Sequence, residues 1–307
     1  MRILVTGATG FIGRRLIPAL LDAGHRVRVL LRPGVRNPRL PPGQPVEVAL
    51  SRLDDRSGLQ AALAHVDAVV HLATGEHRGP RGRALYPVDV AGTRHLAAAA
   101  QGRGVRVVVY LSHLGASPTA AYPVLRAKGL AEQALRQAAA HFPTTVVRVG
   151  PVVGPGDHFV RPLARWVRTW PAGWPLPLPG GGSTLVHPLW LEDLVAALLV
   201  LLEEPAFWGR VYELGGPEHL TLHEVVQALQ VHLRRPHPLV AMPPLLARWA
   251  TFWLHNLWPG FPFHPYWLDY LATHRTADPD TLPREFGILP ERLTALLPLI
   301  LPREAPA

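Results

Sequence analysis

Short apolar runs alternate with longer amphipathic segments over the first 150 residues. The apolar runs predict buried strands, because a strand covered on both faces is apolar throughout rather than at every second position. They fall at residues 3–5, 25–32, 45–50, 67–73, 105–111 and 144–149, and the expected helices lie at 14–21, 56–64, 92–102 and 125–139. This alternation predicts an α/β fold, a doubly wound parallel sheet with helices on both faces.

The pattern changes beyond residue 150. Pro, Gly and Trp are dense between residues 151 and 182, followed by an expected helix at 191–202 and a short strand at 211–214. Thr221 then predicts the cap of a helix that reaches about Leu233. We therefore expect a first domain at 1–150 and a smaller, mostly helical C-terminal lobe at 151–307, from which a stretch around 183–215 returns to the first sheet.

Three glycines stand between the first expected strand and the first expected helix, spaced Gly7-x-x-Gly10-x-x-Gly13. At such a junction the first glycine permits a tight turn, the second lets the backbone approach a pyrophosphate, and the third lets the helix pack closely on the strand. Free N–H groups at the helix N-terminus also favour an anion. The loop therefore predicts a nucleotide-binding site.

Arg32 bears on the choice of nucleotide. It stands at the end of the second expected strand, about twenty residues beyond the glycines, where an acidic residue would bind a ribose 2′-hydroxyl. A guanidinium suits a 2′-phosphate, so NADP(H) is preferred over NAD(H), which stays possible, and Arg14 and Arg36 could assist. The alternative is that Arg32 is one of many surface arginines.

The glycine spacing, with Thr6 before it and Phe11-Ile12 inside it, resembles the extended or atypical branch of the short-chain dehydrogenase/reductase superfamily, which includes NAD-dependent epimerases and dehydratases. Segments 90–93, 111–112 and 148–157 and Lys128 follow in the superfamily's order. Segments 180–193, 212–217 and 286–290 are similar to the nucleotide-binding accessory subunit of respiratory complex I and its bacterial relatives. The resemblance implies a Rossmann fold and a nicotinamide cofactor, and in that subgroup tight NADPH binding, often without demonstrated turnover.

The resemblance also implies a set of cofactor contacts in the loops that follow the strands. They are Gly7, Thr9, Gly10, Phe11, Ile12, Gly13, Arg32, Leu53, Leu72, Ala73, Thr74, Leu111 and Lys128. Arg52 stands where relatives often place an adenine-facing aspartate, so we expect an altered adenine contact.

Lys128 is the only lysine among 31 Lys and Arg residues, and it falls where the superfamily places its catalytic lysine. A compact ammonium can hydrogen-bond the nicotinamide ribose and lower the pKa of a neighbouring phenol, roles that a guanidinium fits poorly. The superfamily's tyrosine should stand four residues earlier, on the same helix face, but position 124 is valine. Tyr122 precedes Pro123 and is expected in the loop or at the helix cap.

Ser112 and His113 are the other candidate catalytic residues. Ser112 corresponds to the superfamily's active-site hydroxyl or forms part of the cofactor floor, and His113 could act as an acid or base near neutral pH. The missing tyrosine and the altered serine segment put ordinary carbonyl reduction in doubt and leave nucleotide binding intact.

Three functional hypotheses follow. The first is an atypical NADP(H)-dependent oxidoreductase on an apolar quinone- or carbonyl-type substrate, in which Lys128 orients the ribose and Tyr122 or His113 supplies the proton. The second is a catalytically silent NADPH-binding accessory, assembly or redox-sensing subunit. A nucleotide-sugar epimerase or dehydratase comes third, because the tyrosine is missing and the C-terminal lobe is apolar.

Aromatic residues dominate the segment from 242 to 270. They are Trp249, Phe252, Trp253, Trp258, Phe261, Phe263, Tyr266, Trp267 and Tyr270. Trp249 and Trp253 share a helical stripe with Leu246 and Leu257. Either this stripe packs on the second lobe and roofs the cofactor cleft, or it forms a surface for a membrane, an apolar substrate or a protein partner.

Composition narrows the class of protein. The net charge of +9 comes from scattered arginines without a basic run of five or a zinc-ligand spacing, so we expect no nucleic-acid partner. Cysteine is absent, which excludes disulfides and thiolate metal sites, and no metal is expected. The first strand begins immediately after Met1, and the longest apolar run, 194–202, is too short to span a bilayer. We expect a cytoplasmic protein, with peripheral membrane contact possible.

Overall fold

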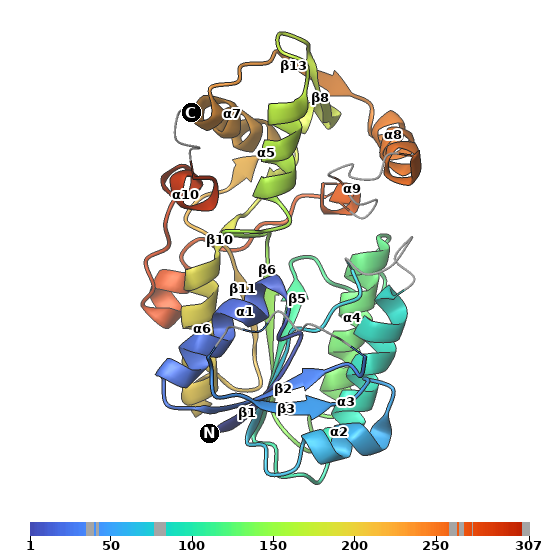
Figure 1. Ribbon diagram of the computed structural model, residues 1–307, viewed down its shortest axis with the longest axis vertical. Helices are drawn as coiled ribbons and strands as arrows, with labels where there is room; N and C mark the ends of the chain where they lie inside the picture. Colours follow the sequence, from blue (N-terminus) through green and yellow to red (C-terminus); the bar gives the residue numbers. More distant parts are fainter. Residues whose placement is uncertain are drawn as a thin grey trace. The chain divides into compact units, whose positions relative to one another are not determined.

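The computed structural model describes residues 1–34, 40, 43–76, 84–257, 263, 267–271 and 273–302, without the side chains of residues 255, 256, 269 and 270. The chain forms two compact units, labelled in Figure 1 by their helices and strands. Unit 1 comprises Met1–Val149 and Leu194–Glu213, and unit 2 comprises Gly150–Asp193 and Leu214–Ala307. Arg36, Trp258, Phe261 and Tyr266 lie outside the described residues.

Unit 1 is built on a seven-stranded parallel sheet with the order β11-β6-β5-β4-β1-β2-β3, which confirms the predicted fold class. In the interior strand β1, Val5 pairs with Val29 on one side and with Val70 on the other, and all three side chains are buried. The strands are β1 (Arg2–Thr6), β2 (Arg26–Leu31), β3 (Glu47–Leu50), β4 (Ala68–His71), β5 (Val107–His113), β6 (Thr144–Val149) and β11 (Val211–Leu214).

Helices cover both faces of this sheet. Figure 1 shows α2 (Arg56–Ala62), α3 (Thr93–Ala100) and α4 (Pro123–Gln137) on one face, and α1 (Phe11–Asp22) and α6 (Leu191–Glu203) on the other. One core cluster joins Leu59 of α2, Leu96 of α3 and Leu135 of α4 to buried side chains of the sheet. Burial of this apolar face, at about 25 cal/mol per Å², drives the layered packing. A short helix, η4 (Pro205–Phe207), precedes β11.

Unit 2 packs helices around short strand pairs. Its helices are α5 (Val160–Thr169), α7 (Leu222–Leu233), α8 (Pro244–Leu257), α9 (Trp267–Tyr270) and α10 (Leu293–Ile300), with short helices η3 (Gly180–Gly182) and η5 (Leu282–Phe286). Its strand pairs are β7 (Val152–Val153) with β10 (Leu189–Trp190), β9 (Leu185–Val186) with β12 (Leu220–Thr221), and β8 (Leu176–Pro179) with β13 (Leu239–Met242). Thr221 caps α7, as predicted, and the Glu224 side chain accepts in return from the Thr221 N–H.

The helices of unit 1 differ from the predicted boundaries by up to three residues. The helix expected at 92–102 is α3, and a π-helical turn that was not predicted, η2 (Tyr86–Gly92), runs directly into it at Thr93. Helix α4 begins at Pro123, and Tyr122 is its N-cap residue. Among the described helices none is long and apolar enough to cross a membrane.

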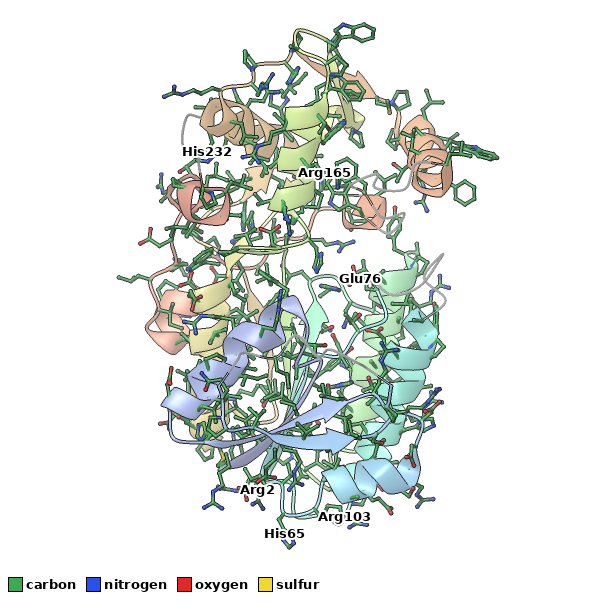
Figure 2. The ribbon with its side chains drawn as sticks, viewed as in Figure 1. Arg2, His65, Glu76, Arg103, Arg165 and His232 are labelled. Carbon is green, nitrogen blue, oxygen red and sulfur yellow. The ribbon has the colours of Figure 1, made fainter. Side chains whose placement is uncertain are left out.

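The expectation that the aromatic stripe packs on its own lobe is wrong for α8. Trp249 is 57% exposed and Trp253 is 53% exposed, and Leu246 and Leu257 are exposed too. Figure 2 shows the side chains of α8 extending away from the ribbon of unit 2. The cause is that α8 contacts its unit through small residues, chiefly the buried Ala247.

Candidate functional site

The loop between β1 and α1 forms a backbone cradle built on three glycines. Gly7 adopts a φ of +73°, and a Cβ there would lie 2.7 Å from the carbonyl carbon of Leu72, so no other residue fits this turn. The Gly10 N–H donates to the Gly7 carbonyl over 2.9 Å, and Gly10 caps α1 without a side-chain hydrogen bond. The positive end of the α1 dipole favours an anion at this loop, and the loop suits the pyrophosphate of a dinucleotide.

The cradle lies where the order of the strands reverses. From β1 the chain runs outward through β2 and β3, and then returns to β4 on the other side of β1. Ligands of doubly wound sheets bind at such a switch point, beyond the carboxyl ends of the strands. Leu72, Ala73 and Thr74 follow β4 directly, and the Ala73 N–H donates to the Thr6 hydroxyl oxygen over 3.3 Å.

His71, at the end of β4, is locked as a neutral imidazole. The Thr93 hydroxyl donates to the Asp89 carbonyl, so Nε2 of His71 must donate to Thr93 over 2.9 Å, which leaves Nδ1 to accept from Thr6 over 2.6 Å. Burial, with the charge of Lys128 second, lowers the pKa of His71 to about 3. His71 therefore ties the end of β1 to the start of α3 without carrying charge.

The predicted cofactor contacts are distributed around this edge. Thr9 lies in the glycine loop, and Phe11 and Ile12 begin α1. Arg32 is exposed and follows the last residue of β2. Leu53, after β3, is partly buried against the core, whereas Arg52 beside it is exposed and forms a two-pronged ion pair with Asp54.

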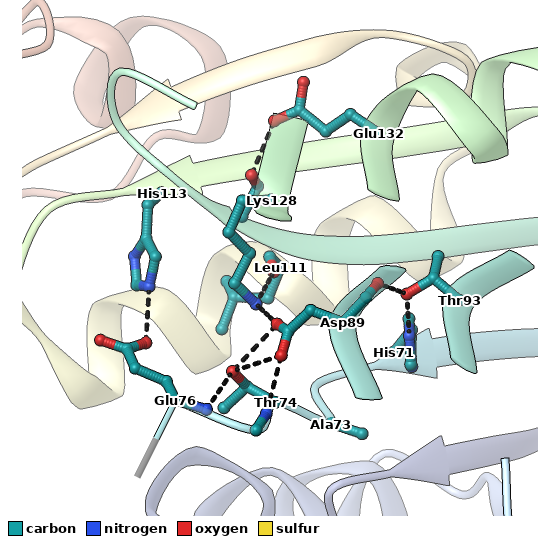
Figure 3. A network of polar contacts seen from close by, with 12 residues as sticks. His71, Ala73, Thr74, Glu76, Asp89, Thr93, Leu111, His113, Lys128 and Glu132 are labelled. Carbon is teal, nitrogen blue, oxygen red and sulfur yellow. Dashed lines mark hydrogen bonds and ion pairs between the residues drawn. The ribbon is translucent and has the colours of Figure 1, made fainter. Parts of the chain in front are cut away.

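Lys128 forms the centre of a buried polar network, drawn in Figure 3. Its Nζ lies 3.0 Å from Oδ1 of Asp89 and 3.5 Å from the carbonyl oxygen of Leu111. Asp89 is completely buried, and it also accepts from the Thr74 hydroxyl over 3.0 Å and from the Gly75 N–H over 2.7 Å. The carboxylate thus holds the ammonium at the carboxyl ends of β4 and β5.

The electrostatics of this network favour the ammonium form. Burial by itself lowers the pKa of Lys128, but attraction to the Asp89 carboxylate opposes it, and the pKa is raised. Lys128 Nζ lies 5.3 Å from the centre of the Tyr110 ring. Lys128 lowers the pKa of that phenol, but burial raises it by more, so Tyr110 stays protonated and is not an activated acid.

Ser112 belongs to a second buried network. Its hydroxyl donates to Glu132 over 2.6 Å, and Arg148 binds the same carboxylate over 2.8 Å and Glu213 over 3.0 Å. The hydrogen bond to Glu132, with burial opposing it, raises the pKa of Arg148. Ser112 is therefore turned toward α4 and β6, and it ties β5 to α4.

His113 and Tyr122 differ in their relation to Lys128. His113 Nε2 lies 3.1 Å from Oε2 of the buried Glu76, whose own N–H donates to Thr74, so the pair adjoins the Lys128 network (Figure 3). Tyr122 is the N-cap residue of α4, and no described hydrogen bond joins its hydroxyl to Lys128. Position 124, where the tyrosine of the resemblance should stand, is a buried valine.

Sequence reasoning missed three acidic residues of the site: Glu76, Asp89 and Glu132. Asp89 stands immediately before the segment 90–93 that carried part of the resemblance, and a lone lysine at a buried position requires a carboxylate partner. The need of Lys128 for a carboxylate partner was therefore the signal in the sequence that could have pointed to Asp89. Among the described residues no group of three or more His, Asp or Glu side chains is placed to hold a metal ion.

A parallel sheet with a glycine cradle at its switch point, and a lysine reaching the same edge from α4, defines the extended short-chain dehydrogenase/reductase class. Residues 3–215 match the model of the NAD dependent epimerase/dehydratase family, and the chain belongs to this family. The predicted family is therefore confirmed.

Individual relatives support this assignment. The chain is 31% identical over 251 residues to NADH dehydrogenase (ubiquinone) 1 alpha subcomplex subunit 9, mitochondrial, of Arabidopsis thaliana. That alignment covers 80% of this chain but only 61% of the relative, so the chain spans less than two thirds of that protein. Sterol demethylase protein B of Methylococcus capsulatus is 29% identical over 319 residues, with 94% of each chain covered.

Solved structures share the fold. MoeE5 in complex with UDP-glucose and NAD superimposes with a TM-score of 0.73 at 22% identity, covering 98% of this chain and 97% of that one. At this identity the likeness shows the fold alone.

Proposed function

We propose that the chain binds NADP(H) and acts as an atypical oxidoreductase on an apolar carbonyl- or quinone-type substrate. One observation carries the proposal: the only lysine of the chain is held charged and buried by Asp89 at the carboxyl ends of the sheet. Removing two charges from water costs several kcal/mol per ion, so such a pair is weak evidence for stability and points to function.

The chain's own residues would hold the cofactor as follows. The glycine cradle and the N-terminus of α1 suit the pyrophosphate, and the exposed Arg32 suits a 2′-phosphate, which favours NADP(H). An ammonium has three N–H donors, and the described hydrogen bonds of Lys128 to Asp89 and Leu111 use two, which leaves one for the nicotinamide ribose. When bound, the nicotinamide supplies the hydride.

The chain must then supply a proton to the reduced substrate. Because position 124 is valine, we assign this role to His113, with Glu76 holding its imidazole from 3.1 Å. The carboxylate fixes the position of the imidazole from which the proton is transferred. The name of the Methylococcus relative, a sterol demethylase protein, supports a large apolar substrate over a sugar diphosphate.

A second candidate function is a catalytically silent NADPH-binding subunit. The buried Val124 favours it, because the tyrosine that donates the proton in the resembled superfamily is missing. The Arabidopsis relative, named as a subunit of NADH dehydrogenase, supports it as well.

The test is a fluorescence titration of the purified chain with NADPH and, in parallel, NADH, followed by an oxidation assay with quinones and carbonyl compounds. We expect tighter binding of NADPH and cofactor oxidation above background. Binding without oxidation of NADPH by any substrate would favour the silent subunit, and no binding of either nucleotide would overturn both candidates.

A further inference from the structure

We propose that the exposed face of α8 binds an anionic membrane surface. This α8 face consists of Leu245, Leu246, Trp249, Phe252, Trp253 and Leu257, each more than 40% exposed. It lies wholly in unit 2, so the proposal is independent of the cofactor chemistry assigned to unit 1.

The orientation of α8 is the reverse of an ordinary surface helix. The buried positions are small, with Ala247 4% exposed and Thr251 8% exposed, whereas Trp249 and Trp253 are 57% and 53% exposed. An amphipathic helix normally turns its large apolar side chains toward the core. Here the large side chains are left to water, and a contiguous apolar patch of this kind marks an interaction surface.

The α8 face also has the geometry of a helix that lies flat on a bilayer. Leu245, Trp249, Trp253 and Leu257 recur every four residues and so share one side of the helix. At 1.5 Å per residue the 14 residues of α8 extend about 21 Å, too short for the roughly 30 Å hydrocarbon core. Tryptophan is enriched at the membrane interface because its ring is apolar with one polar N–H.

The positive charge around α8 favours an anionic partner. Arg248 is the only Asp, Glu, Lys or Arg residue within α8, and no acidic residue occurs between Glu224 and Asp269. The same stretch contains Arg234 and Arg235, both exposed, and the whole chain carries a net charge of +9. Anionic headgroups complement this charge, whereas a second copy of the chain would bring like charge to the interface. The favoured occupant is therefore an anionic lipid surface.

The test uses the full chain in flotation with two kinds of vesicle, phosphatidylcholine alone and phosphatidylcholine with phosphatidylglycerol. We expect the chain to float with the anionic vesicles, and we expect Trp249→Gln combined with Trp253→Gln to lower vesicle affinity at least about tenfold. Trp174→Gln is the matched control, because Trp174 belongs to unit 2, is 65% exposed and lies outside α8. Thermal unfolding of each variant checks that unit 2 still folds.

Three outcomes would overturn the proposal. The first is that the wild-type chain fails to float with anionic vesicles, and the second is that it binds neutral vesicles as tightly as anionic ones. The third is that the double variant binds anionic vesicles with the same affinity as Trp174→Gln. Light scattering after gel filtration tests whether a second copy of the chain binds the α8 face instead. If the wild type and Trp174→Gln are dimers and the double variant is a monomer, the occupant is a second copy and not a membrane.

Discussion

The Nζ atom of Lys128 lies 3.0 Å from Oδ1 of Asp89, and both side chains are buried. The two residues come from α4 and from the π-helical turn η2, so the ion pair joins two elements at the carboxyl end of the sheet. Ionic strength should affect it little, because screening by salt is weak for buried pairs.

Removing one member of this pair should destabilise the protein strongly. Asp89→Ala leaves a buried ammonium without its carboxylate, and we expect the free energy of unfolding to fall by about 3–5 kcal/mol. Asp89→Leu combined with Lys128→Met removes both charges and should recover most of that loss. Denaturant unfolding of Asp89→Leu, of Lys128→Met and of the double variant measures the coupling between the two residues. A loss in the double variant equal to the sum of the two single losses would contradict the coupling.

Arg32→Ala should weaken NADPH binding selectively. A charge-assisted hydrogen bond contributes about 1.5–3 kcal/mol, so we expect an affinity loss of about 10- to 100-fold for NADPH and little change for NADH. Arg26→Ala is the matched control, because Arg26 is also exposed but begins β2, at the opposite end of the strand. Equal losses for both nucleotides would show that Arg32 does not read the 2′-phosphate.

Glu76→Gln tests the assignment of the proton donor. If the buried Glu76 holds His113 for proton transfer, kcat should fall about 100-fold while the KM for NADPH stays unchanged. His113→Gln should lower kcat by a similar factor, and Tyr122→Phe should leave it unaltered. Loss of turnover in Tyr122→Phe alone would transfer the role to Tyr122.

The periodicity of unit 1 made its sheet predictable, because buried parallel strands are apolar runs and their crossover helices have a different period. The glycine spacing located the cradle, and the uniqueness of Lys128 singled it out. Asp89 and Glu76 were missed because they follow no motif. They join the site only in the fold, where η2 packs beside α4 and Glu76 contacts His113 of β5.

Unit 2 was less predictable for two physical reasons. Strands of two residues, such as β7 and β9, are too short to show a period of two. The helix α5 was hidden by the surrounding Pro, Gly and Trp, although the Asp157 carboxylate accepts three N–H groups at its start. For α8 the apolar stripe located the helix, but it did not reveal that Ala247 and Thr251 would form the buried side.

His187 should make unit 2 sensitive to acid. Its Nε2 donates to the Gly216 carbonyl over 2.8 Å and its Nδ1 accepts from the Ala277 N–H over 3.1 Å, so the folded state holds the neutral ring. Burial lowers the pKa of His187 from 6.5 to about 4. The unfolded chain therefore takes up the proton first, and stability that is full above pH 6.5 is lost as the pH falls toward 4.

The measurement is the free energy of unfolding at pH 7 and pH 4.5 for the wild type and for His187→Gln. Glutamine at position 187 lowers stability at both pH values, but it does not titrate. Between pH 7 and pH 4.5 the free energy of unfolding of the wild type should therefore fall by about 2 kcal/mol more than that of the variant. Parallel pH profiles would show that His187 does not carry this sensitivity.

Gly10 and Gly13 should separate cofactor binding from folding. A Cβ on Gly13 would lie 2.5 Å from the Gly7 oxygen and 2.8 Å from the Ala8 Cα, whereas a Cβ on Gly10 would contact only the Gly7 oxygen, at 3.1 Å. Gly13→Ala should therefore cost about 1–3 kcal/mol of stability. Gly10→Ala should cost about 1 kcal/mol or less, yet lower NADPH affinity at least tenfold, because its methyl group occupies the space of the pyrophosphate. Unfolding and NADPH titration of both variants check this, and NADPH binding by Gly10→Ala at wild-type affinity would contradict the cradle.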